Sequence, residues 1–224
     1  MRLRRVAAIA SIVGLGLLLQ AGAAVAQQED PINLFVVDVR AAFPSYNTSE
    51  GLAAPLGLEK DQLAPRGMGL EIGAHLYPIR GRSIALGVGA TMLLSRSTKR
   101  PEIPEDEEEA DPADPTVRTR VNAFTPQISL NFGSRRGYSY ISGGIGTVTR
   151  SIEATEGTID AEVTDDTRAR ALNYGGGARW FAAAHVAFTF DLRFYRVASQ
   201  EATTTSAALP SQRLFVVSAG VSFH

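Results

Sequence analysis

Three histidines are the first residues of this 224-residue chain that could take part in catalysis. A serine hydrolase needs a serine that a histidine activates, with a carboxylate that orients the imidazole ring. His75 lies in a segment of strand-like alternation, whereas His185 lies in a short turn and His224 is the last residue of the sequence. The sequence holds no G-x-S-x-G motif and no adjacent histidine–serine pair. We therefore expect that the protein is not an enzyme and that His75 is a satisfied interior residue.

An acidic segment is the second feature that could carry chemistry. PEIPEDEEEADPADP, residues 101–115, has eight acidic residues between Glu102 and Asp114, and Lys99 and Arg100 precede it. Carboxylate oxygens suit Ca²⁺ or Mg²⁺, which could bridge lipid phosphates. The segment lacks the D-x-[DN]-x-[DN]-G spacing of a calcium loop, and its prolines favour an extended, solvated loop. We expect a solvated, repulsive loop tip, with a divalent-cation site as the alternative, and no cofactor.

The composition excludes several other kinds of site. With no cysteine, the chain has no disulfide, thiolate metal site, cysteine nucleophile or lipidated cysteine. Its formal net charge of −1 gives no reason to expect nucleic-acid binding. The glycine clusters SGGIG (142–146) and NYGGGAR (173–179) lack the G-x-G-x-x-G spacing of a nucleotide-binding turn, so bends and close packing explain them better.

Residues 1–26 have the features of a secretory signal peptide. Three arginines in MRLRR precede an apolar run from Val6 to Leu19, and the cleavage-like triplet Ala24-Val25-Ala26 follows. The alternative is an uncleaved anchor, but a spanning helix needs about 20 apolar residues, and Gln20 interrupts this segment. We expect cleavage after Ala26 and one exported domain over residues 27–224.

Segments with a period of two recur along the rest of the chain. In AFTFDLRFYR, residues 187–196, phenylalanine and leucine alternate with threonine, aspartate, arginine and tyrosine. Such a period predicts a β-strand with two different faces. Eight segments show it, the glycine-rich ones more weakly: 34–43, 70–78, 84–94, 123–132, 138–148, 171–180, 187–196 and 214–223.

The connections between these segments alternate in length. Three are tight, at residues 79–82, 134–137 and 182–185, and four are long, at residues 44–67, 97–117, 150–167 and 199–212. Brief turns at one end and larger loops at the other are typical of transmembrane barrels. The sequence predicts an all-β fold, an eight-stranded antiparallel up-and-down transmembrane β-barrel. A soluble β-sandwich or lipocalin-like barrel, with its apolar face inside, is the alternative.

The polar face favours a barrel that has lipid outside. It is rich in glycine and carries charges of both signs, which suits a narrow lumen better than a water-exposed sheet face. We expect Asp191 and Arg193 to pair with opposite charges from Arg40, Glu71 or Arg179. The predicted interior polar network comprises Asp38, Arg40, Glu71, His75, Gln127, Arg179, Asp191 and Arg193.

Two further expectations concern aromatic residues and proline. Aromatic residues near segment ends, among them Tyr138, Tyr140 and Phe181, are expected in interfacial girdles around the membrane. Pro126 falls inside the fourth segment, where a closed barrel has no free edge, so a bulge or a different register is expected there.

Several of these segments resemble the outer-membrane β-barrel domain family, the OmpA/OmpX-like small eight-stranded barrels. YSYISGGIGTV is similar to the family's tyrosine-then-glycine strand, and NYGGGARWFAAAHVAFTFDLRFYR to its glycine-rich strand, tight turn and following strand. LFVVSAGVSFH resembles the terminal strand that the barrel-assembly machinery reads, although His224 follows the expected final aromatic residue. The resemblance spans residues 32–224 and implies an assembly signal formed by Phe215, Val217, Val221 and Phe223.

The expected role is structural or surface-interacting, with a packed polar lumen and four long external loops. The resemblance implies a bacterial outer-membrane location and contact with outer-membrane lipid, lipopolysaccharide and the barrel-assembly machinery. We expect a monomer with an unidentified external partner at the loops. A soluble periplasmic barrel that binds an apolar ligand is the second hypothesis, and a lipid-modifying outer-membrane enzyme is the third.

Overall fold

A computed structural model describes residues 31–101, 115–155, 165–199 and 210–224, with residues 165–167 described by their backbone alone. The predicted signal peptide (1–26) and nearly all of the acidic segment (102–114) lie outside these residues. Among the described residues, no helix is long and apolar enough to cross a membrane.

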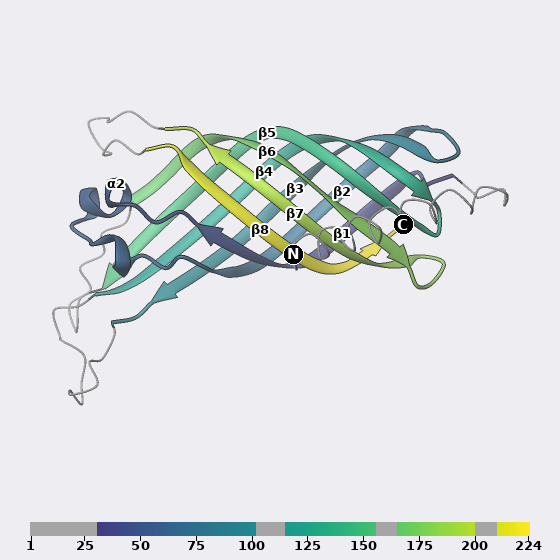
Figure 1. Cartoon of the computed structure of the whole chain (residues 1–224). Helices are drawn as coiled ribbons and strands as arrows, with labels where there is room; N and C mark the ends of the chain where they lie inside the picture. Colours follow the sequence, from purple (N-terminus) through teal and green to yellow (C-terminus); the bar gives the residue numbers. More distant parts are fainter. Residues whose placement is uncertain (1–30, 102–114, 156–164, 200–209) are drawn as a thin grey trace, which may run out of the picture. The chain divides into compact units, whose positions relative to one another are not determined.

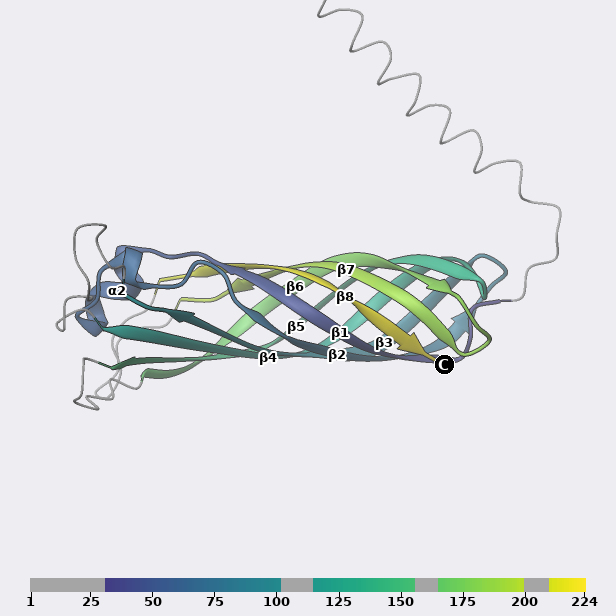
Figure 2. The ribbon, with the colours of Figure 1, turned by 90° about the horizontal axis from the view of Figure 1, so that it is seen from below.

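Eight antiparallel strands form one closed barrel, which confirms the fold class expected from the alternation (Figure 1). Each strand pairs with the next along the chain, and β1 pairs with β8 to close the sheet. Figure 2 shows the strands tilted against the long axis of the barrel, as closure requires. The strands are β1 (Phe35–Tyr46), β2 (Met68–Arg80), β3 (Ile84–Lys99), β4 (Thr116–Ser134), β5 (Gly137–Thr155), β6 (Asp165–Phe181), β7 (Val186–Val197) and β8 (Gln212–Phe223).

The two faces of the strands have the opposite polarity to those of a soluble β-barrel, with apolar side chains outside and polar side chains inside. In β7, Phe188, Phe190, Leu192 and Phe194 are exposed on the outer wall, whereas Asp191 and Arg193 are fully buried in the lumen. The same alternation recurs in β1, where Phe35, Val37 and Val39 face outward. Because the large apolar side chains lie outside and the charges inside, the barrel has the wall of a membrane-spanning fold.

All eight strands are longer than the sequence pattern predicted, and the largest extensions are in β3, β4, β5 and β6. β4 and β5 each have 19 residues, whereas a spanning strand needs about 9–11. The expected loops at 97–117 and 150–167 are therefore partly strand. Their ladders continue through polar pairs such as Thr98↔Arg118, and Arg120 forms an ion pair of 2.9 Å with Glu153. In these extensions the outer face carries polar residues, so the sequence shows no alternation of apolar and polar residues there. Every second side chain still points into the barrel.

The loop between β1 and β2 folds over the long-loop end of the barrel. It contains the short helix α2 (Glu50–Ala53) and two 3₁₀ helices, η1 (Ala54–Leu56) and η2 (Lys60–Gln62). Its buried side chains Leu52, Ala53, Leu58 and Leu63 pack with Val117, Ile152 and Ala154 of β4 and β5. Since β4 and β5 are not neighbours of β1 or β2 in the sheet, this loop crosses the mouth of the barrel.

The bulge expected at Pro126 is absent, and one occurs at another proline. β4 keeps the same register with β5 on both sides of Pro126, from Phe124↔Thr147 to Gln127↔Gly144, and the ladder is only interrupted between these pairs. Pro126 still pairs with Ala90 of β3. The register shift lies instead between Leu76 and Ile79 of β2, where it accommodates Pro78.

The girdle prediction is wrong for two tyrosines. Tyr138 and Tyr140 are buried inside the lumen at 4% and 3% exposure. They have the inward parity of Ser142, one of the buried polar residues of the same strand. Phe181 also packs inward, against a cluster that includes Tyr77 and Tyr138 near the short-turn end.

Candidate functional site: the charged layer of the lumen

The middle of the lumen holds three arginines and three carboxylates that water does not reach. Arg40, Arg179 and Arg193 are at most 1% exposed, and the carboxylates of Asp38, Glu71 and Asp191 are fully buried. These six are the buried arginine, aspartate and glutamate side chains among the residues that the structure describes. The layer therefore has no net charge, which is the condition under which buried ions are tolerable.

Asp38 and Arg179 join β1 to β6 across the lumen. Arg179 Nε donates to Asp38 Oδ1 at 2.9 Å, and Nη2 donates to Oδ2 at 2.6 Å, a bidentate geometry. Ser222 Oγ of β8 donates to the same carboxylate at 2.5 Å. The guanidinium also lies 4.2 Å from the ring centroid of Tyr140 and 5.3 Å from that of Tyr138.

Arg40 connects this pair to the rest of the layer. It forms a buried ion pair with Glu71 of β2 and approaches Asp38 to 3.5 Å. Its Nη1 donates to the hydroxyl oxygen of Tyr140 at 3.0 Å, and that hydroxyl donates to Asp191 Oδ2 at 2.5 Å. Tyr140 is therefore the link between two groups of charges.

Asp191 and Arg193 pair with each other rather than with charges from other strands, which corrects the pairing expected from the sequence. Arg193 Nε and Nη2 each donate to one oxygen of Asp191 at 3.0 Å. Residues two apart on a strand share a face, so this partner was the nearest one available. Arg193 Nη1 also donates to Gln127 Oε1 at 2.6 Å and to Asn173 Oδ1 at 2.7 Å.

His75 lies at the side of this network among amide and ring groups. Its Nε2 is 3.0 Å from Gln127 Nε2, and its ring stacks on Tyr77 with 6.4 Å between centroids. Gln127 Nε2 also donates to Thr91 Oγ1 at 2.6 Å. With these contacts the network includes side chains from every one of the eight strands.

The structure thus brings the eight predicted network residues into one connected layer. Five members were missing from the prediction, namely Thr91, Tyr140, Asn173, Ser218 and Ser222. Their inward parity was readable in the sequence for Ser222 and Tyr140. Tyr140 was nevertheless expected in the interfacial girdle, because it lies near the end of its segment.

Apolar layers lie on both sides of the charges. Towards the short turns, Ile32, Val36, Tyr77, Ala85 and Tyr138 form a buried cluster. Towards the long loops, a second buried cluster comprises Ala42, Leu93, Val121, Ala123, Val148, Ala171, Tyr195, Val197, Leu214 and Val216. The charged layer is therefore sealed by apolar side chains at both ends.

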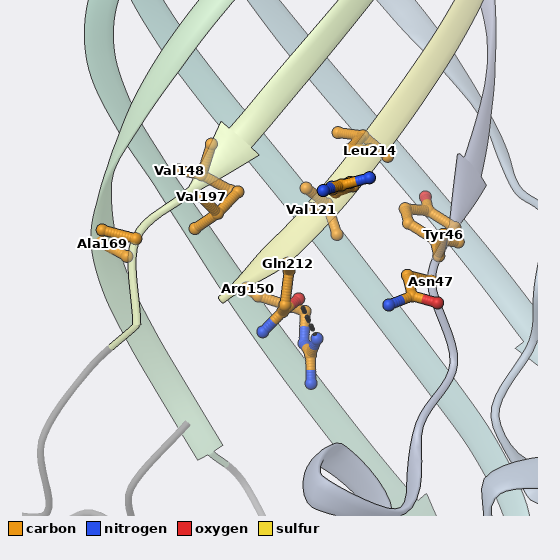
Figure 3. A pocket seen from close by; sticks show the side chains of 11 residues that line it. Tyr46, Asn47, Val121, Val148, Arg150, Ala169, Val197, Gln212 and Leu214 are labelled. Atoms are coloured by element: carbon orange, nitrogen blue, oxygen red, sulfur yellow. Dashed lines mark hydrogen bonds between the residues drawn. The ribbon is translucent and has the colours of Figure 1, made fainter. Parts of the chain in front are cut away.

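A small pocket lies outside the second apolar cluster, at the long-loop end (Figure 3). Val121, Val148 and Leu214 line it, together with Arg150, which donates to Gln212 Oε1 at 2.5 Å. Its volume is about 30 Å³, which is space for about two water molecules. None of the six charged residues of the layer lines this pocket.

The residues of the predicted assembly signal form the outward face of β8. Val217 and Val221 pair with Phe43 and Val39 of β1, and Phe223 is exposed at the short-turn end. His224 packs its ring on Phe181 at 4.7 Å and lies 5.3 Å from the ring of His185. Recognition of this strand by the assembly machinery remains a prediction.

Comparisons with known proteins find similarity of structure and none of sequence. No protein-family model matches the chain, and no curated protein matches it. The crystal structure of Neisserial surface protein A superposes with a TM-score of 0.50 at 14% identity, covering 87% of this chain and 99% of that one.

Two further structures align less well. Ail, the attachment invasion locus protein of Yersinia pestis, gives a TM-score of 0.45 at 12% identity, covering 87% of this chain and 99% of that one. The outer membrane protease OmpT of Escherichia coli gives 0.44 at 8% identity, covering 84% and 96%. The match to Neisserial surface protein A, together with the closed eight-stranded topology, confirms at the level of fold the resemblance seen in the sequence: this chain has the architecture of the small eight-stranded outer-membrane barrels.

Proposed function

We propose that this protein is a bacterial outer-membrane barrel with a structural or surface-interacting role, and that its mechanism is physical rather than catalytic. The observation that carries the proposal is the inverted polarity of the barrel. A neutral layer of six buried charges lies inside a wall whose exposed residues are large and apolar, such as Ile128 and Ile145 at 68% and 69% exposure. In water a protein with such a wall would aggregate, whereas in a bilayer the apolar wall contacts the lipid tails.

The same polarity argues against the soluble alternative. A periplasmic barrel that binds an apolar ligand needs apolar residues around an internal cavity. Here the lumen is filled by the charged layer and by the apolar clusters that seal it. A continuous water path for conduction is opposed by the same packing.

A non-catalytic role is also part of the proposal. A hydrolase would need His75 close to a serine hydroxyl and a carboxylate. The described contacts of His75 are with Gln127 and Tyr77 instead. Lipid analysis of cells with and without the protein tests this point, because an acyl-chain change that depends on the protein would reveal an enzyme.

The orientation of the barrel can be tested by cysteine labelling, since the natural chain has no cysteine. Lys60 lies in the folded loop at one end, and Ala183 lies in the turn between β6 and β7 at the other. Intact cells that carry Lys60→Cys should react with a membrane-impermeant maleimide, whereas cells that carry Ala183→Cys should react only after lysis. Both variants should fractionate with the outer membrane and migrate differently on a detergent gel before and after heating.

Three results would contradict the proposal. Recovery in the soluble periplasmic fraction would exclude a membrane barrel. Labelling of Ala183→Cys but not Lys60→Cys in intact cells would show that the barrel has the opposite orientation, with its short turns outside. Single-channel conductance in planar bilayers would show that the lumen is not sealed.

A further inference from the structure

Three arginines form a row on the outer wall where the apolar band ends, at the long-loop end. Arg170 of β6, Arg196 of β7 and Arg213 of β8 are all exposed. Arg196 and Arg213 are directly paired across β7 and β8, and Leu172, the next outward residue below Arg170, is paired with Arg196. The three guanidinium groups therefore extend from neighbouring positions of one continuous sheet surface, which we call the arginine row.

The arginine row is unfavourable by itself. Directly opposite residues of an antiparallel pair have Cβ atoms about 4.5–5.5 Å apart, and like charges there destabilise the sheet. In a second direct pair of outward arginines, Arg96↔Arg120, the repulsion is offset because Glu153 lies 2.9 Å from Arg120. No carboxylate among the described residues pairs with Arg196 or Arg213.

An aromatic row lies directly beneath the arginine row. Tyr174, Phe194 and Phe215 occupy the outer faces of β6, β7 and β8 and are paired in register. Tyr174 stacks on Phe194 with 5.5 Å between ring centroids, and Phe194 lies 4.8 Å from Phe215. Aromatic side chains of this kind sit at the boundary between lipid tails and headgroups.

We propose that the arginine row and the aromatic row together bind a phosphorylated lipid of the outer leaflet. The arginines would hold its phosphate groups, because the guanidinium fork matches phosphate in geometry and charge. The aromatic row would contact the start of its acyl chains. The proposal rests on the proposed function, since it requires this wall to be embedded in the outer membrane with the long loops outside.

Bisphosphorylated lipid A, titrated into the full-length purified barrel in neutral detergent micelles, is the probe that tests this site. Lipid binding is read by native mass spectrometry and by the rise in unfolding temperature. The double variant Arg196→Gln/Arg213→Gln should bind at least about tenfold more weakly, because each lost guanidinium removes charge-assisted hydrogen bonds. Lipid A without its phosphates should bind the unchanged protein as weakly as intact lipid A binds the double variant.

Controls separate a specific site from general charge. Arg82→Gln/Arg136→Gln removes two exposed arginines from the short turns at the opposite end and should leave binding unchanged. Arg196→Lys/Arg213→Lys keeps the charge without the planar fork and should bind with intermediate affinity. Inorganic phosphate at the same concentration should not raise the unfolding temperature of the unchanged protein.

Equal lipid A binding by Arg196→Gln/Arg213→Gln and the unchanged protein would overturn the site, as would equal binding of lipid A with and without phosphates. Stabilisation by inorganic phosphate alone would show a free-anion site instead of a lipid site. Heat-modified gel migration shows whether each variant is folded before its binding is compared. Failure of the unchanged protein to fold in micelles would instead contradict the proposed membrane function, so the two failures are distinguishable.

Discussion

Replacement of Asp38 by asparagine should destabilise the barrel more than any comparable change of an exposed carboxylate. The carboxylate is fully buried and accepts two hydrogen bonds from Arg179 and one from Ser222, and it lies 3.5 Å from Arg40. An asparagine side chain at this position would have nearly the same shape but no charge. The charged layer would then hold three arginines against two carboxylates.

The magnitude follows from the cost of an uncompensated buried charge. Breaking a buried ion pair by removing one partner costs about 3–5 kcal/mol, against a total stability of roughly 5–15 kcal/mol for a domain. The double variant Asp38→Asn/Arg179→Met restores neutrality, since two arginines then face two carboxylates. It should therefore cost less than the sum of the single variants, with a coupling of about 2 kcal/mol.

Trp180, the one tryptophan of the chain, provides the signal. Its side chain is 57% exposed on the outer wall, so its fluorescence should report transfer from lipid to water on unfolding. Reversible urea unfolding in lipid vesicles then gives the free energy of unfolding for each variant. The control is Glu50→Gln, whose carboxylate is exposed and 3.8 Å from Lys60, and which should cost less than about 1 kcal/mol.

The reasoning would be refuted if Asp38→Asn cost no more than Glu50→Gln. It would also be refuted if the effects of Asp38→Asn and Arg179→Met simply added. Either result would mean that water reaches the charged layer and screens it.

Three further predictions concern the barrel wall and the short-turn end. A Cβ at Gly144 would lie 1.9 Å from a main-chain oxygen of β4, whereas one at Gly143 would lie 3.5 Å from its nearest neighbour. In urea unfolding, Gly144→Ala should therefore lower the free energy of unfolding by about 1–3 kcal/mol, and Gly143→Ala should hardly change it. Ile128→Arg on the outer wall should cost about 2–4 kcal/mol in vesicles, and no loss would mean that lipid does not cover this position. Burial and the nearby His185 lower the pKa of His224, so an NMR titration should find that pKa below about 6.5. Because the folded state then resists protonation, the contribution of His224 to stability should be fully present above the unfolded-state pKa of about 6.5. It should be lost as the pH falls from there through the lower folded-state pKa.

The alternation of single side chains was enough to predict the barrel, because lipid and a narrow lumen impose opposite polarities on the two faces of every strand. The period of two in AFTFDLRFYR agrees with the burial of Asp191 and Arg193. The tight turns were also readable, since arginine and glycine in IRGR and SRRG, and the three alanines before His185, interrupt the alternation there. The extensions of β4 and β5 were not, because outside the membrane the outer face no longer needs apolar residues.

The partners within the lumen were harder to predict than its members. Parity places a residue inside, but its contacts depend on the stagger between strands, which the sequence does not state. Arg179 and Asp38 are 141 positions apart and meet only because closure of the barrel brings β6 opposite β1. Asp191 and Arg193 were the exception, since neighbours on one strand face need no knowledge of stagger.

The charged layer explains how a barrel can present fixed surfaces outside. Its hydrogen bonds and ion pairs connect side chains from all eight strands, so separation of the strands would leave buried polar or charged groups without their partners. That cost opposes lateral opening and sliding of the register, as a packed apolar lumen without directional bonds would not. The relative positions of Arg196, Arg213 and Phe194 on the outer wall are consequently held by the layer behind them. Loosening the layer by Asp38→Asn should therefore weaken lipid A binding at the arginine row, although Asp38 itself contacts no lipid.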